Sequence, residues 1–373
     1  MRVLFDGWSL VHHPITPASL HLLSILENQP GQIRPLLALP EPPPRWLDFP
    51  ETKIIPTPNT PWGHLRWEQS YLPSLAKQLD IQLLHLAAPA APAFPNLNIV
   101  FSPAGFGAGL VGWPGIQPAS VTSDHILERL RTSLGLGGLE RVAGILWPRD
   151  LPVPVLEGPI IPFSPVLPLN FSSLPSPFAR KSLLDGDQLP DLPGDFILYQ
   201  GPGGRQQLEL LLQAWNWAAP AVGEYHPLLL VGLEEVDQQL VSELRKAMNF
   251  GDSLQVLSGV TPGMLPYLYQ RSTAVFHPAP ASPWCGPVRL ALASGKPLVA
   301  TEDSLTGAIA GPAAYLVKGN DARALGAALV TVVVEQELAD SFSSAGRLRA
   351  QDWVNSGFSE QLLELYTSVC SAG

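Results

Sequence analysis

A glycine-rich turn in the second half of the chain could bind a charged ligand. Gly201, Gly203 and Gly204 follow the apolar run 196–200 and precede a helical pattern. Backbone N–H groups at the start of a helix can bind a phosphate, and Arg205 adds the only cation of this turn. The spacing is not GxGxxG, and glycine turns are common in α/β folds. Arg205 is therefore either a phosphate ligand or a solvent-exposed residue at a helix start.

Several histidines occur where proton transfer is feasible. His12 and His13 are adjacent between an expected strand and an expected helix, which suits acid–base chemistry or a partly exposed loop. His277 ends an expected strand, where it either contacts a ligand or is a buried strand-end histidine. The histidines form no HExxH pattern, and two cysteines are too few for a Cys-based zinc site. We expect no metal.

The composition narrows the class of protein. The chain has 373 residues, of which 46% are apolar, enough for the cores of two domains. Its net charge of −10 is a poor match for nucleic acid. The two cysteines, Cys285 and Cys370, indicate no disulfide framework and fit a reducing, cytoplasmic location.

One long segment, residues 81–123, contains no charged residue. Its repeated prolines and glycines break any continuous helix, so we expect no transmembrane segment there. Buried strands and packed loops are the preferred interpretation, and a peripheral contact with a membrane is the alternative.

Apolar runs alternate with helical patterns along the whole chain, which predicts parallel sheets covered by helices. A helix is expected over 62–79, with a kink at Pro73. The predicted fold is α/β, with two tandem Rossmann-like domains at 1–180 and 181–345 and a C-terminal helical segment at 346–373. The expected strands are 2–5, 32–39, 53–55, 81–86, 97–101, 196–200, 227–231, 254–257, 274–277, 297–300 and 315–317.

Several segments of the chain resemble family-4-type glycosyltransferases of the GT-B fold. The resemblance is carried by FILYQGPGGRQQLELLLQAW, VLSGVTPGMLPYLYQRSTAVFHPA, VRLALASGKPLVATEDSLTGAIAGPAAYLVKGNDARALGAAL and RLRAQDWVNSGFSEQLLELYTSV, and in the first half by LRWEQSYLP and LLHLAAPA. It implies two domains facing across a cleft, with a C-terminal helix that packs back on the first. It also implies transfer of a sugar from a nucleotide-sugar to an acceptor with retention at the anomeric carbon.

The donor residues of that family are replaced in this sequence. Alignment on the Gly-Lys-Pro turn at 295–297 places Ser282 and Leu290 where the resemblance implies two glutamates, and a slip of one residue brings Arg289 to the second place. Ser282 accepts a hydrogen bond without charge. Pro202 and Gln206 stand where basic residues are implied near the phosphates. Trp284, in a loop without charge, either stacks on a ligand ring or packs in a core.

On the acceptor side, the resemblance implies a His-Asp pair at the end of a strand. The strand expected at 97–101 leads to Ser102 instead. His125, preceded by Asp124, is either a displaced version of the pair or a residue in the first turn of a helix. The acceptor-side candidates are therefore His12, His13 and His125.

These residues leave three interpretations of the function. One is a glycosyltransferase-like protein with a degenerate donor site, a non-catalytic binding or partner subunit in a glycan or cell-envelope pathway, without a cofactor. The alternative is an active retaining transferase with a nucleotide-sugar donor, a glycan or lipid acceptor and a rebuilt site. That site needs convergence of Arg205, His277, Ser282 and Arg289. A structural dimer component, with an exposed apolar patch, is a third interpretation.

Overall fold

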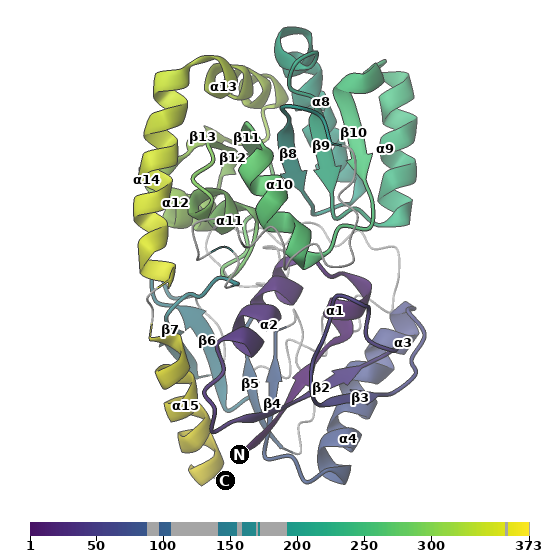
Figure 1. Ribbon diagram of the computed structural model, residues 1–373, viewed down its shortest axis with the longest axis vertical. Coiled ribbons are helices and arrows are strands. Elements are labelled where there is room, and N and C mark those ends of the chain that lie inside the picture. The colour runs from purple at the N-terminus through teal and green to yellow at the C-terminus, as the bar shows by residue number, and fades with distance from the viewer. Residues whose placement is uncertain are drawn as a thin grey trace. The chain divides into compact units, whose positions relative to one another are not determined.

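The computed structural model describes residues 1–87, 97–105, 141–154, 159–168, 171, 192–354 and 357–372. The chain forms two compact units, each built on a parallel sheet (Figure 1). Unit 1 contains Met1–Pro168, Ser282–Cys285 and Asn355–Gly373, and unit 2 contains Leu169–Ala281 and Gly286–Val354.

Within the described residues, the sheet of unit 1 has seven strands in the order β3-β2-β1-β4-β5-β6-β7. Within the helix expected over 62–79, a π-helical turn ends two residues before Pro73, which has no backbone N–H to donate. The elements of unit 1 are β1 (Arg2–Asp6), α1 (Trp8–His12), α2 (Pro17–Glu27), β2 (Arg34–Leu39), β3 (Thr52–Ile54), α3 (Pro61–Arg66), the π-helix η1 (Trp67–Tyr71), α4 (Leu72–Gln78), β4 (Leu83–Leu86), β5 (Asn98–Phe101), β6 (Gly144–Pro148), β7 (Ile160–Phe163) and α15 (Phe358–Ala372).

Both faces of this sheet are covered, so its central strands read as continuous apolar runs. Val3 and Phe5 on β1 pack in one cluster with α2 and α15, whereas Leu4 packs in another with Trp67 and α4. Helix α15 contributes Phe358, Leu362, Leu365 and Tyr366 to the first cluster. The last helix therefore belongs to the core of the first unit.

Unit 2 has six described strands in the order β10-β9-β8-β11-β12-β13, all parallel. Its core contains the apolar face of α8, with Leu208, Leu211, Leu212 and Trp215 buried against the sheet and α13. The elements are β8 (Ile197–Gln200), α8 (Arg205–Val222), β9 (Leu228–Val231), α9 (Glu235–Ala247), η4 (Gly251–Ser253), β10 (Leu254–Leu257), η5 (Pro262–Met264), α10 (Leu265–Arg271), β11 (Ala274–His277), α11 (Pro287–Ala293), β12 (Leu298–Glu302), α12 (Ser304–Ala310), η6 (Gly311–Ala313), β13 (Tyr315–Lys318), α13 (Ala322–Val334) and α14 (Gln336–Val354).

The predicted α/β class with two parallel sheets is confirmed. The bounds of the units differ from the expected 180/181 and 345/346. Phe171 packs on Tyr269 at 5.8 Å between ring centres, which ties the start of the connecting segment to unit 2. Helix α14 packs on α11 and stays in unit 2 as far as Val354.

No helix in the described part of the chain is both long and apolar enough to span a membrane. Part of the charge-free segment 81–123, residues 88–96 and 106–123, lies outside the described residues.

Candidate functional site

The strand order of unit 2 defines where a ligand would bind. Strands β9 and β10 lie on one side of β8, and β11, β12 and β13 lie on the other. In open α/β sheets, ligands bind beyond the carboxyl ends of the strands where the order reverses. This place lies between β8 and β11, where the glycine turn 201–204 and His277 are found.

The glycine turn is already bound by a carboxylate of the same unit. The backbone N–H of Gly204 donates to Oδ1 of Asp237 at 2.8 Å. A Cβ on Gly203 would lie only 1.7 Å from Oδ2 of Asp237, and Gly204 has a φ of 95°, which favours glycine. Asp237 stands in the first turn of α9, the helix that follows β9. An entering phosphate would meet this negative charge.

Arg205 points along the outside of α8. Its Nη1 lies 3.2 Å from Oε1 of Glu209, one helical turn away, and its side chain is 69% exposed. This geometry agrees with a solvent-exposed arginine at a helix start.

Replacing Arg205 by Gln should therefore change the free energy of unfolding by less than about 0.5 kcal/mol, as for exposed ion pairs in general. Urea unfolding of the two proteins measures the difference. A loss of several times that size would contradict the exposed position.

His277 is fully buried at the end of β11. Its Nε2 donates to the carbonyl of Pro280 at 3.4 Å, and its ring stacks on Tyr199 at 6.3 Å between centres. Burial lowers the pKa of His277 to about 4, so the ring is neutral at pH 7. It offers no positive charge to a diphosphate.

The loop that carries Ser282 and Trp284 belongs to unit 1. Ser282 Oγ donates to the carbonyl of Ala104 at 2.9 Å. Trp284 is fully buried and stacks on His21 at 4.4 Å between ring centres, as the core-packing alternative expects. The adjacent thiol of Cys285 is also buried and donates to the carbonyl of Val166.

Arg289 is buried between two helices of unit 2. Only 1% of the residue is exposed, and its guanidinium carbon lies 4.6 Å from the centre of the Trp353 ring. It thus links α11 to α14, whereas Arg205 pairs with Glu209 on α8. The two arginines of the rebuilt donor site have different partners on different helices.

In unit 1 the strand order reverses between β1 and β4. Directly after β1 the chain forms α1, and Trp8 at its start is 2% exposed. The indole of Trp8 stacks on His64 at 4.3 Å between ring centres. Below it, Asp6 Oδ1 accepts from the backbone N–H of Trp8 at 3.0 Å and from Nε1 of Trp67 at 2.8 Å. This end of β1 is filled by aromatic side chains.

His12 and His13 are therefore at the end of a helix and not in the loop that we expected. His12 lies edge-on to Trp8 at 4.6 Å, and burial lowers its pKa, opposed by Glu41. The carbonyl of His13 accepts from the hydroxyls of Thr16 and Ser19, which fixes the turn into α2. His125 lies outside the described residues.

A buried histidine that the sequence analysis did not single out lies on β4. His85 Nε2 is 2.8 Å from Oγ of Ser102, and Nδ1 bonds to the hydroxyl of Tyr366 on α15. Burial lowers the pKa of His85 to about 3. Ser102 stands where the resemblance implied the His-Asp pair. That replacement was the only feature of the sequence that drew attention to this end of β5.

The architecture of two units, each built on a parallel α/β sheet, is that of the GT-B fold. Residues 196–349 match the family described as glycosyl transferases group 1. A search of curated proteins finds no match.

Solved structures similar to the chain share its fold at low sequence identity. Sucrose-phosphate synthase from Thermosynechococcus elongatus is 15% identical, with a TM-score of 0.69 and 100% of both chains covered. WaaG, a glycosyltransferase involved in lipopolysaccharide biosynthesis, is 13% identical, with a TM-score of 0.70 and 98% and 99% of the two chains covered. HepE from Anabaena, solved with UDP and glucose, is 14% identical, with a TM-score of 0.66 and 99% and 100% covered. The expected GT-B fold is thereby confirmed.

Proposed function

We propose that this chain is a glycosyltransferase-like protein that transfers no sugar itself and acts as a binding or partner subunit in the synthesis of a glycan. The observation that carries the proposal is the hydrogen bond of 2.8 Å from the Gly204 N–H to the Asp237 carboxylate. The N–H that a phosphate would use is satisfied by a group of the same charge as the phosphate. A phosphate that entered this solvent-exposed turn would lie beside the like-charged carboxylate of Asp237, which disfavours its binding.

The cations needed to offset that repulsion have other roles. Stabilising a departing diphosphate requires positive groups aimed at it. Arg205 pairs with Glu209 in solvent, Arg289 lies under Trp353, and His277 is neutral. HepE, which shares the fold, is solved with UDP and glucose, so the proposal rests on the side chains of this chain and not on its fold.

Two comparisons support the proposal that this chain takes part in glycan synthesis. Residues 196–349 match the group 1 glycosyl transferases, and the fold is similar to that of WaaG, which is involved in lipopolysaccharide biosynthesis. A protein partner or a second copy of the chain would then be the functional contact. Light scattering of the purified chain tests the second-copy arrangement directly.

Calorimetric titration with UDP, GDP and ADP and with their glucose or mannose conjugates tests the proposal. The wild-type protein should give no isotherm at millimolar ligand, whereas Asp237→Ala, which frees the Gly204 N–H, should gain measurable nucleotide binding. Asp252→Ala, an equal charge change at an exposed position of the same unit, is the matched control and should remain silent. A micromolar isotherm for the wild type, weakened by Arg205→Gln, would instead establish the rebuilt donor site of an active transferase.

A further inference from the structure

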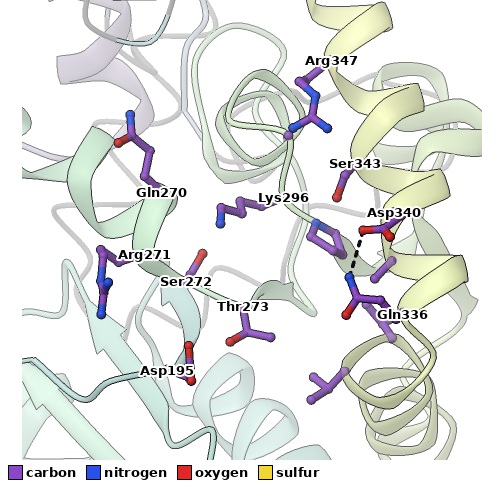
Figure 2. Close-up of a pocket in the computed structure, with 15 residues that line it drawn as sticks. Asp195, Gln270, Arg271, Ser272, Thr273, Lys296, Gln336, Asp340, Ser343 and Arg347 are labelled. Carbon is purple, nitrogen blue, oxygen red and sulfur yellow. Dashed lines mark hydrogen bonds between the residues drawn. The ribbon is translucent and has the colours of Figure 1, made fainter. Parts of the chain in front are cut away.

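Unit 2 contains a cavity of about 520 Å³ at the end of its sheet opposite to the glycine turn. Ser272 and Thr273 come directly before β11, and Lys296 comes directly before β12. These residues lie at the amino ends of the strands, whereas a nucleotide-sugar would bind beyond the carboxyl ends. Helix α14 forms the facing wall, as Figure 2 shows. The cavity is therefore a separate place for a ligand.

Three cations from three elements line this cavity. Arg271 ends α10, Lys296 precedes β12, and Arg347 extends from α14. Lys296 lies centrally between α10 and α14 (Figure 2). The pKa of Lys296 is lowered by burial and by the positive charges of Arg347 and Arg271. The three positive charges therefore repel one another, and this repulsion lowers the stability of the folded unit when no anion is bound between them.

The cavity compensates these charges only in part, since the guanidinium of Arg271 donates to the carbonyl of Gly194 at 2.8 Å. In the described part of the chain, no carboxylate lies within 4.0 Å of the charged nitrogens of these three side chains. Asp340, which also lines the cavity, accepts a hydrogen bond from Gln336 at 2.9 Å (Figure 2). Asp195 is exposed at the rim. In a chain with a net charge of −10, such an accumulation of positive charge is unusual.

The backbone at the turn before β12 is shaped around Arg347. Gly295 has a φ of 61°, which favours glycine, and a Cβ there would lie 2.2 Å from Nη1 of Arg347. The missing side chain lets the guanidinium lie across the turn, next to Lys296. Thr273 and Ser343 add hydroxyl groups to the lining. Guanidinium, ammonium and hydroxyl groups together form a donor set suited to phosphate oxygens.

We propose that this cavity binds a small phosphate monoester through Lys296, Arg347 and Arg271. A doubly charged phosphate placed among the three cations relieves their mutual repulsion. The volume falls within the range that holds a small organic ligand, so the phosphate can carry an attached group such as glycerol. The same chemistry is offered by a soluble phosphorylated metabolite and by a lipid headgroup, and the two sources are separated below.

Glycerol 3-phosphate is the soluble probe, titrated by calorimetry at low ionic strength. Lys296→Gln and Arg347→Gln should each weaken its binding tenfold or more, because each removes a charge-assisted contact. Lys246→Gln, an equal charge change on the exposed face of α9, should leave the affinity unchanged. Arg347→Lys keeps the charge and should recover part of the affinity, and thermal unfolding of each variant without ligand verifies that it folds.

Flotation with vesicles that contain phosphatidic acid, whose headgroup is a phosphate monoester, compared with phosphatidylcholine vesicles, examines the lipid source. Binding to the anionic vesicles alone that is lost in Lys296→Gln identifies a headgroup as the phosphate. The proposal is overturned if the wild type binds neither probe, or if Lys246→Gln weakens binding as much as Lys296→Gln does. The nucleotide titrations concern the opposite end of the sheet, so either set of results can fail without the other.

Discussion

Lowering the pH from 7 to 5 is expected to reduce the free energy of unfolding by about 2 kcal/mol in each unit. The cause is one buried histidine per unit that must stay neutral in the fold. Burial lowers the pKa of His85 in unit 1 to about 3 and that of His277 in unit 2 to about 4, from the value of 6.5 that both have in an unfolded chain. Below pH 6.5 the unfolded state binds a proton that the folded state does not. The stability contributed by neutral histidine is therefore complete above pH 6.5 and is lost as the pH falls toward 4 and 3.

Urea unfolding at a series of pH values measures this slope. Replacing His85 by Gln, which cannot titrate, should flatten the pH dependence of unit 1 and leave that of unit 2. His226→Gln, at a half-buried position, is the matched control and should retain both slopes. Equal slopes in the wild type and His85→Gln would contradict the assignment.

Truncation of Arg289 to Ala is expected to destabilise unit 2 by about 2–4 kcal/mol, from the lost packing and the lost cation–π contact in a dry setting. The guanidinium is 1% exposed and lies 4.6 Å from the centre of the Trp353 ring, so its removal leaves a cavity between α11 and α14. Arg289→Met fills most of that volume and should lose less.

Thermal and urea unfolding of the two Arg289 variants measures the loss in the free energy of unfolding. If Arg289 were a donor-binding residue, Arg289→Ala would fold as stably as the wild type, and its defect would appear only in ligand binding. That result would reopen the rebuilt donor site.

The sequence predicted the fold well because the fold depends on patterns that recur along the chain. Buried parallel strands such as 228–231 read as apolar runs, and the helices between the strands show a 3.6-residue spacing. Boundaries were harder to predict, because they depend on contacts distant in sequence. Phe171 packs on Tyr269, and α14 continues to Val354 because it packs on α11.

The candidate site was only partly predictable. Sequence reasoning located the glycine turn and the strand end at His277, since both follow from the order of the elements. It did not find Asp237, which stands in the first turn of α9 and reaches the glycine turn because β8 and β9 are neighbours. The cationic cavity was missed for the same reason: Arg271, Lys296 and Arg347 have no spacing in the sequence that relates them.

Helix α15 belongs to the core of unit 1 but is synthesised after unit 2. Residues 355–373 are made after all of unit 2, yet Phe358, Leu362 and Tyr366 complete the core around β1. At a translation rate of about 5–20 residues per second, unit 1 therefore waits about 10–40 seconds for its last helix. During that interval the apolar side chains that α15 later covers lack their packing partners, so the core of unit 1 depends on residues that are synthesised after unit 2.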